Sequence, residues 1–168
     1  MNRFAPLFVT AALVAGCATV SAPEPSALRT ADGRQVGTVQ LREDGSGVGI
    51  RVNLSGLPAG THGLHIHAVG RCDAPGFTTA GPHWNPGSRE HGTENPQGPH
   101  AGDLPNITIS AAGTGSVETR LEGWRIRGGE RAIVDADGAA VVLHAKPDDY
   151  RTDPSGNSGD RIACAVLG

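Results

Sequence analysis

The chain has 168 residues and a formal net charge of −3 at pH 7; aromatic residues make up 4% of it, and it contains 25 Gly and 12 Pro. Beyond a targeting segment, this length suits one domain with a core of its own, built from Val, Ile, Leu and Ala. Nucleic-acid binders normally carry a clustered positive patch, so the mild negative charge argues against that class.

The N-terminus has the pattern of a bacterial export signal. Arg3 is followed by an apolar stretch over residues 7–15, which is too short to cross a bilayer as a helix. Residues 13–17, LVAGC, resemble a lipobox, which implies a signal peptide over residues 1–16 and a lipid on Cys17. Ala18 in place of Asp is compatible with the outer membrane, so we expect a periplasmic protein anchored there, although the side it faces stays open. The alternative is an ordinary secretory signal cleaved near Ala22.

Residues 17–29 are expected to form the anchor and a flexible tether, because residues 18–26, ATVSAPEPS, are rich in Pro, Ser and Ala. The domain is expected over residues 30–168. In it, residues 36–40 and 48–54 alternate apolar and polar side chains, as half-buried strands do, and Glu43-Asp44-Gly45 marks a hairpin turn between them. Further short strands are expected within residues 61–67, 104–109, 115–121, 130–134, 139–144 and 162–167.

Many short strands without a helical pattern predict an all-β antiparallel sandwich or barrel. Two long segments, residues 68–102 and 145–161, have no periodicity. Irregular loops of this length inside a compact domain are usually functional or disordered.

The chain contains three cysteines. If Cys17 carries a lipid, Cys72 and Cys164 remain as a pair that can form a disulfide in an oxidising compartment. Two unrelated free thiols are the alternative, and outside the cytoplasm we favour the disulfide.

Seven side chains form a candidate metal site. His65 and His67 are two residues apart in an expected strand, so they project to one face, although such a pair alone is more often structural. The first long loop adds three histidines and is followed by Asp103, and a tetrahedral Zn²⁺ held by three imidazoles and one carboxylate would order such a loop. His144 ends a strand that could reach the first pair. The loop histidines are His83, His91 and His100.

The chain resembles the copper–zinc superoxide dismutase family over residues 30–168. The resemblance implies an eight-stranded Greek-key sandwich or barrel with two long functional loops, and dismutation of superoxide to O₂ and hydrogen peroxide by alternating reduction and reoxidation of copper. The stretches that carry it are residues 63–67 (GLHIH), 80–86 (AGPHWNP), 91–92 (HG), 100–104 (HAGDL), 142–146 (VLHAK), 156–157 (GN) and 161–164 (RIAC).

Carried over to these positions, the resemblance assigns two metal shells that share His83 as a bridge between copper and zinc. Imidazole suits both metals, and a closed tetrahedral shell with a carboxylate suits zinc, which undergoes no redox change. The copper ligands would be His65, His67, His83 and His144, and the zinc ligands His83, His91, His100 and Asp103.

The resemblance also implies supporting roles. Arg161 would present its charged guanidinium to the small anionic substrate, and a Cys72–Cys164 disulfide would hold it in place. Asp148 would link His65 to His91, and His62 would be structural. Two features depart from the common pattern: residues 73–77 look like an insertion, and Asp160 next to Arg161 could weaken the attraction of the anion.

Three other functions are less consistent with the sequence. A copper chaperone or metal reservoir would be expected to carry extra Cys or Met, and the chain has one Met and three Cys. An inactive relative would lack a copper ligand or Arg161, and a copper-only relative would lack zinc ligands. The expected partners are superoxide and, through the lipid anchor alone, a membrane. The oligomeric state stays open, with a homodimer as one option.

Overall fold

The computed structural model describes residues 24–168, so the predicted signal peptide, Cys17 and the start of the tether lie outside the described residues. Within this range no helix is long and apolar enough to cross a membrane. The prediction of an all-β fold is confirmed. The elements are β1 (Ser26–Thr30), β2 (Gln35–Asp44), β3 (Gly47–Ser55), β4 (Gly60–His62), β5 (Leu64–His67), the 3-10 helix η1 (Thr78–Ala80), β6 (Ile107–Ile109), β7 (Thr114–Glu122), β8 (Ala140–His144) and β9 (Arg161–Val166).

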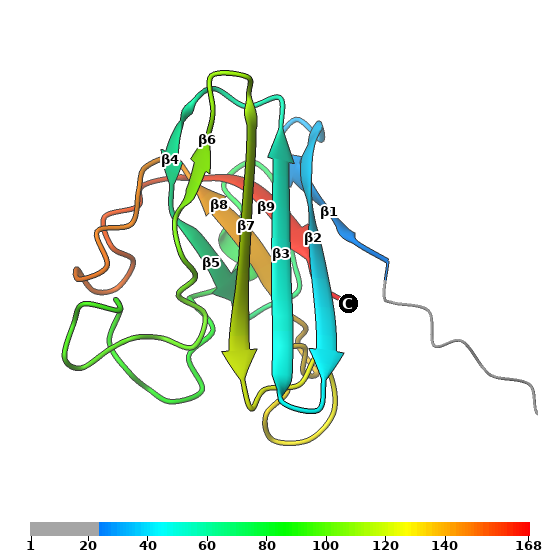
Figure 1. Ribbon diagram of the computed structural model, residues 1–168, viewed down its shortest axis with the longest axis vertical. Coiled ribbons are helices and arrows are strands. Elements are labelled where there is room, and N and C mark those ends of the chain that lie inside the picture. The colour runs from blue at the N-terminus through cyan, green and yellow to red at the C-terminus, as the bar shows by residue number, and fades with distance from the viewer. Residues whose placement is uncertain (1–23) are drawn as a thin grey trace, which may run out of the picture.

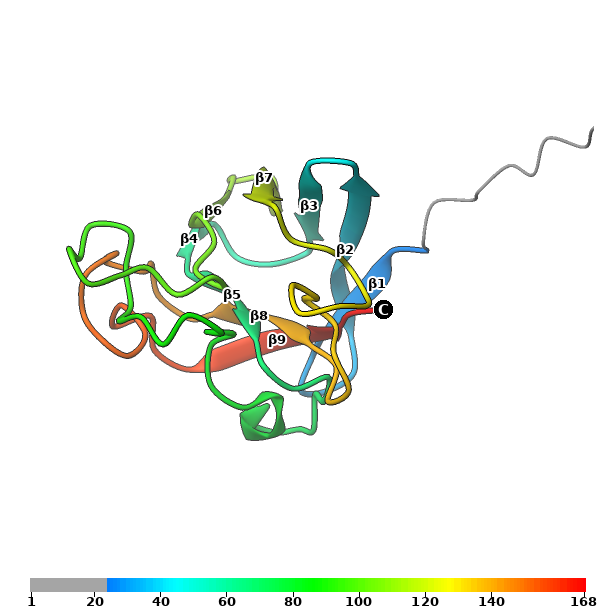
Figure 2. The same cartoon turned by 90° about the horizontal axis from the view of Figure 1, so that it is seen from below.

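The strands form one large curled sheet and one small sheet. The large sheet has the order β5-β8-β9-β1-β2-β3-β7, and β4 pairs with β6. The large sheet curls so that β5, β8 and β9 lie across from β2, β3 and β7 in two layers (Figures 1 and 2). The connections from β3 to β5 and from β7 to β8 run from one end of the strand order to the other, like the long return connection of a Greek key.

The core lies between the two layers and follows the predicted alternation. In β3, Val48, Ile50, Val52 and Leu54 are at most 3% exposed, whereas Arg51, between two of them, faces solvent. Period-two alternation therefore places one face of the strand in the core. As expected from the composition, the core consists almost entirely of Val, Ile, Leu and Ala.

The strand expected over residues 61–67 is divided at Gly63 into β4 and β5. With this division, with β1 added and with no strand at residues 130–134, residues 24–168 contain nine strands, one more than the eight expected. β4 pairs with β6, whereas β5 pairs with β8. The N–H of Gly63 donates to the carbonyl of Lys146 at 2.8 Å, and its carbonyl accepts from the N–H of His144 at 2.9 Å. A Cβ at Gly63 would lie 2.9 Å from the Cβ of Ser158. Glycine thus allows the chain to change sheets close to the second long loop.

Other segments also differ from the prediction. β1 lies partly in the predicted tether, yet it pairs with β2 and β9, and Leu28 is fully buried. The packed domain therefore begins before residue 30. Residues 130–134 form no strand: Ala132 makes only an isolated bridge with Arg125, and the backbone of the segment bonds to residues 125 and 126 rather than to a strand of either sheet. The short helix η1 was not predicted.

The two long loops meet on one side of the barrel. Residues 68–106 connect β5 to β6, and residues 145–160 connect β8 to β9. The second loop and the part of the first loop that follows η1 lie on the left in Figures 1 and 2. They touch at Gly92, where an added Cβ would lie 2.1 Å from the carbonyl oxygen of Tyr150. Every predicted ligand lies on one of these loops or on a strand that ends beside them.

Candidate metal centre

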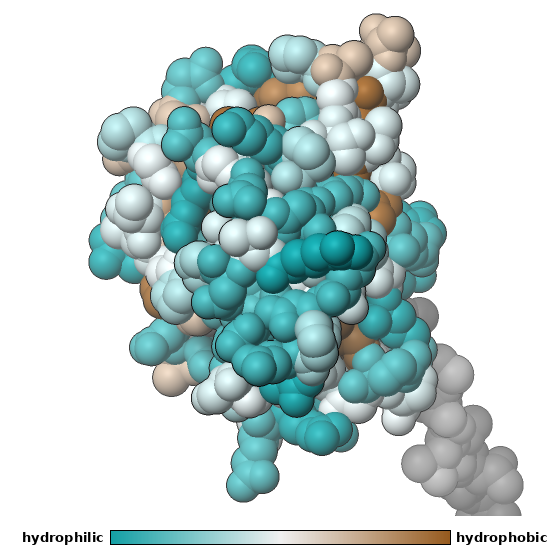
Figure 3. Space-filling model, turned by 90° about the vertical axis from the view of Figure 1, so that its left-hand side faces the viewer, coloured by the Kyte–Doolittle hydropathy of each residue, from teal (hydrophilic) through white to brown (hydrophobic). Residues whose placement is uncertain are grey.

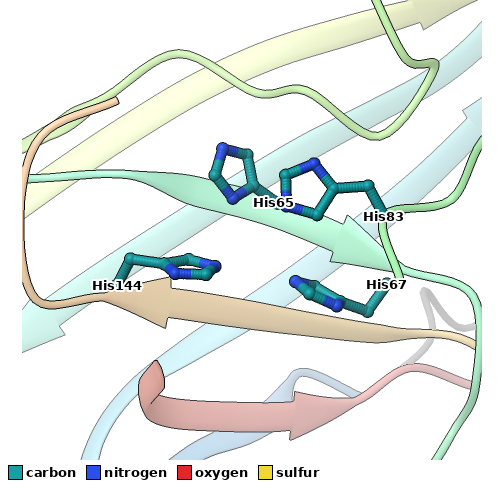
Figure 4. Close-up of side chains that lie close together, drawn as sticks. All are labelled: His65, His67, His83 and His144. Carbon is teal, nitrogen blue, oxygen red and sulfur yellow. The ribbon is translucent and has the colours of Figure 1, made fainter. Parts of the chain in front are cut away.

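Four buried histidines converge from two strands and the first long loop. His65 and His67 point from β5, His144 from the end of β8, and His83 from the loop (Figure 4). Their exposed fractions are 0%, 0%, 3% and 7%, respectively. One ring nitrogen from each lies within 4.8 Å of the others. The predicted copper ligands are therefore gathered at one point.

In each of these rings one nitrogen is bonded and the other has no hydrogen-bond partner. Nε2 of His65 lies 2.8 Å from Oδ2 of Asp148, Nδ1 of His67 lies 2.8 Å from the carbonyl oxygen of Gly81, and Nδ1 of His144 lies 3.1 Å from that of Gly159. An acceptor there places the proton on the bonded nitrogen, so the other presents a lone pair. The unpartnered nitrogens are Nδ1 of His65 and Nε2 of His67, His83 and His144.

Buried lone pairs without donors are costly unless something else satisfies them. Burial lowers the pKa of His65 to about 3, of His67 to about 2 and of His144 to about 4. Burial also lowers the pKa of His83. These rings are neutral at physiological pH, which is the form that binds a metal ion. The four nitrogens therefore fit a cation that prefers imidazole, as copper does.

A second group surrounds Asp103, whose side chain is 1% exposed. Its Oδ1 lies 3.0 Å from Nδ1 of His83, 3.1 Å from Nδ1 of His91 and 3.2 Å from Nδ1 of His100. The Nδ1 atoms of His83 and His100 are 3.3 Å apart. Four ligands about 2.0–2.1 Å from a tetrahedral Zn²⁺ lie about 3.3 Å from one another, so these spacings fit zinc.

His65 lies near both groups. Its ligand atom lies within 4.8 Å of those of His83, His91 and Asp103, and its ring centroid is 4.0 Å from that of His83. However, its unpartnered Nδ1 belongs with the first four nitrogens, and its Nε2 is bonded to Asp148. His100 is the better fourth member of the second group because its Nδ1 touches Oδ1 of Asp103 directly.

Asp148 links the two groups through hydrogen bonds to one histidine of each. Its Oδ2 accepts from Nε2 of His65 at 2.8 Å and its Oδ1 from Nε2 of His91 at 2.9 Å. Although burial acts in the opposite direction, hydrogen bonds from His65 and His91 hold the pKa of Asp148 below its usual range. Likewise, burial alone would lower the pKa of His91, but its hydrogen bonds with Asp103 and Asp148 raise it to about 9. A carboxylate in this position fixes the orientation of both rings.

Arg161 at the start of β9 is held by two backbone carbonyls. Its Nη1 donates to the carbonyl of Phe77 and its Nη2 to that of Gly81, both at 2.8 Å. The carbonyl of Gly81 also accepts from His67, so one residue orients both the guanidinium and a predicted copper ligand. The guanidinium bonds to these carbonyls rather than to the neighbouring Asp160, whose side chain is exposed.

The predicted disulfide is confirmed. Cys72 and Cys164 are bonded, with a Cα–Cα distance of 5.7 Å and a sequence separation of 92. The bond fastens the first loop to β9, three residues after Arg161. His62 is not among the converging nitrogens: its Nδ1 donates to the carbonyl of His144 at 2.8 Å. The side of the molecule toward which the two loops extend is mostly hydrophilic (Figure 3).

Two residues near Asp148 were not singled out from the sequence. Asn106 and Tyr150 bond to its backbone and to its carboxylate, respectively. They lie 44 residues apart in sequence, and neither residue type signals a metal site. Local patterns could not have found them.

Comparisons with known proteins agree with this geometry. The family model for copper/zinc superoxide dismutase matches residues 35–167. Superoxide dismutase [Cu-Zn] 2 of Aquifex aeolicus is 42% identical over 138 residues, which cover 81% of each chain. A crystal structure of a SOD-like protein from Bacillus subtilis matches with a TM-score of 0.82 and 38% identity, covering 88% of this chain and all of that one. Cu/Zn superoxide dismutase from Brucella abortus matches with a TM-score of 0.66 and 27% identity, covering 86% and 99%.

Proposed function

The chain belongs to the copper/zinc superoxide dismutase family and is an enzyme of that class with copper and zinc as cofactors, and we propose that the two metals share one histidine. In this proposal His65, His67, His83 and His144 hold copper. His83, His91, His100 and Asp103 hold zinc, so that His83 binds copper through Nε2 and zinc through Nδ1.

One observation carries the proposal: the two nitrogens of the His83 ring face different groups. Nε2 has no hydrogen-bond partner, like Nδ1 of His65 and Nε2 of His67 and His144 in the first group. Nδ1 lies 3.0 Å from Oδ1 of Asp103 and 3.3 Å from Nδ1 of His100. Only a ring at the boundary between two cation sites can serve both with one nitrogen each.

Copper held by the first group would supply the one-electron chemistry of dismutation, in which two superoxide ions and two protons give O₂ and hydrogen peroxide. The chain's own residues bind the anion and supply a proton. Arg161 stays charged at any physiological pH and donates to an anion that approaches the first group. Nε2 of His83 can hold a proton whenever it is not bound to copper, and Nδ1 keeps the ring in place. That proton can pass to the reduced product.

We also propose, from the sequence, that the protein is exported and anchored in the outer membrane through Cys17. The tether between Cys17 and β1 would leave the domain in the periplasm. A Cys17→Ser variant should have its signal peptide cleaved elsewhere and should no longer be found in the membrane fraction. A Cys17→Ser variant that stays in the membrane fraction contradicts the anchor.

The shared ligand set is tested by two substitutions that address different metals. His144→Ala removes a ligand from the first group alone and should lose copper and dismutase activity while keeping about one zinc per chain. His100→Ala removes a ligand from the second group alone, so in this variant zinc binding should weaken more than copper binding. Metal content by mass spectrometry, measured with superoxide decay, distinguishes them. Full activity and full copper content in the His144→Ala protein would contradict the copper assignment.

A further inference from the structure

Asn106, in the segment that leads into β6, forms two hydrogen bonds with the backbone of Asp148. Its Nδ2 donates to the carbonyl oxygen of Asp148 at 2.8 Å, and its Oδ1 accepts from the N–H of Asp148 at 2.8 Å. A side-chain amide that satisfies both backbone groups of one residue fixes the position of that residue's Cα. The direction in which the Asp148 carboxylate points toward His65 and His91 therefore depends on Asn106.

Tyr150, in the second long loop, forms hydrogen bonds with both Asp148 and Asn106. Its backbone N–H donates to Oδ1 of Asp148 at 2.7 Å, the same oxygen that accepts from His91 at 2.9 Å. Its hydroxyl accepts from the backbone N–H of Asn106 at 2.8 Å. Asn106 thus binds the Asp148 backbone, the Tyr150 hydroxyl binds the Asn106 backbone, and the Tyr150 N–H binds the Asp148 carboxylate. We call this closed set of contacts the Asp148 clasp.

The conformation of Tyr150 shows that the clasp is a specific arrangement. Tyr150 has a φ of 62°, a value that side-chain-bearing residues rarely adopt. Its carbonyl accepts from the N–H of Glu94 at 2.9 Å and lies against Gly92, where an added Cβ would be 2.1 Å away. Tyr150 therefore joins Asp148 to the loop segment that follows His91.

We propose that Asn106 and Tyr150 are positioning residues that tune the zinc shell through Asp148. This rests on the proposed function, in which His91 is a zinc ligand. The clasp sets the Asp148 carboxylate so that Nε2 of His91 stays bonded and its Nδ1 faces Asp103. Loss of the clasp leaves the ligands in place but frees the His91 ring to rotate, so zinc binds more weakly and its coordination is less regular.

Zinc binding to the disulfide-bonded, copper-free protein tests the proposal. Tyr150→Phe removes only the hydroxyl that accepts from Asn106, and one hydrogen bond corresponds to a loss of zinc affinity of about twofold to tenfold. Asn106→Ala removes both contacts with the Asp148 backbone, for which an outer-shell loss of about 10- to 100-fold is expected. Asn106→Asp keeps the acceptor for the N–H of Asp148 and should fall between Asn106→Ala and the wild type.

Thr108→Val is the matched control. Thr108 lies two residues from Asn106, is exposed, and its hydroxyl is 3.1 Å from that of Thr61, so this variant also loses one hydroxyl contact but not the clasp. Zinc affinity is measured by competition with a chelator, and Co²⁺ bound in place of zinc gives an absorption spectrum that reports coordination geometry. The expected result is weaker zinc binding and an altered Co²⁺ spectrum in the Asn106 and Tyr150 variants alone.

Two results overturn the inference: wild-type zinc affinity and Co²⁺ spectrum in Asn106→Ala and Tyr150→Phe, or an equal loss in Thr108→Val. A wild-type protein that binds no zinc would instead refute the ligand assignment under the proposed function, and the inference would fall with it. Urea unfolding of each metal-free variant separates a change in zinc binding from a failure to fold.

Discussion

Removing the Cys72–Cys164 disulfide should lower both stability and activity, through separate physical effects. Replacing both residues by Ser opens a loop that spans 92 residues of sequence. For a loop of this length, the chain-entropy account gives a loss of about 4–5 kcal/mol in the free energy of unfolding. Because whole domains have only about 5–15 kcal/mol in total, the variant should be assayed with both metals bound, which adds stability.

The effect on activity follows from the position of Arg161. The carbonyls of Phe77 and Gly81 that hold its guanidinium belong to the loop that Cys72 fastens to β9. Hydrogen bonds from a charged donor contribute about 1.5–3 kcal/mol each. Without the disulfide the loop that carries both acceptor carbonyls moves, these bonds are lost, and Arg161 takes a broad range of positions. Since a positioned cation raises the rate of anion capture by at least about tenfold, kcat/KM should fall by that factor or more.

Arg161→Ala with the disulfide intact separates the two effects. It should reproduce the fall in kcat/KM with the loop still closed, and it should lose only the stability that its own two hydrogen bonds supply. Combining it with the two Ser substitutions should cause little further loss of activity, because both changes act on the same group. Superoxide decay gives kcat/KM and guanidinium chloride unfolding gives stability. A disulfide-free protein that stays folded with both metals bound and retains full kcat/KM would refute this reasoning.

Three further predictions concern the second group of ligands and the barrel. Gly156→Ala would place a Cβ 1.8 Å from Oδ1 of Asp148 and should weaken zinc binding about 10- to 100-fold in a chelator competition. Gly33→Ala, also at positive φ but with nothing within 4 Å of the added Cβ, should leave zinc binding unchanged. Equal losses in the two variants would show that the contact with Asp148 is not the cause. Leu28→Ala should cost about 2–5 kcal/mol in urea unfolding, and a cost near zero would mean that β1 is not part of the core. Removal of zinc should speed tryptic cleavage after the exposed Arg89, and an unchanged cleavage rate would show that zinc does not order the first loop.

The sequence predicted the parts of the fold that depend on local periodicity. Residues 48–54 alternate so regularly that β3 and its buried face follow from the pattern alone. β1 could not be predicted, because Ser26–Thr30 continues a segment rich in Pro, Ser and Ala and becomes a strand only by pairing with β2 and β9. The break at Gly63 was missed for a similar reason, since its cause is the approach of residues 146 and 158.

The metal ligands of the candidate site could be predicted from the sequence more fully than the residues that support them. His65 and His67 were recognisable from their spacing, and the loop ligands from their concentration in a segment with no other reason to be ordered. The roles of Asp148 and Arg161 came from the family resemblance. Asn106 and Tyr150 could not be found either way, because their contacts depend on where two long loops without periodicity meet.

The central claim, that the chain is a dismutase with copper and zinc bound around one shared histidine, is tested most directly on the purified, metal-loaded wild-type protein. Metal content is measured beside the rate of superoxide decay in the same sample. About one copper and one zinc per chain, with activity that disappears when copper is removed and returns when copper is restored, is the predicted result. Activity that persists without copper, or a protein that binds both metals and leaves superoxide decay unchanged, would contradict the claim.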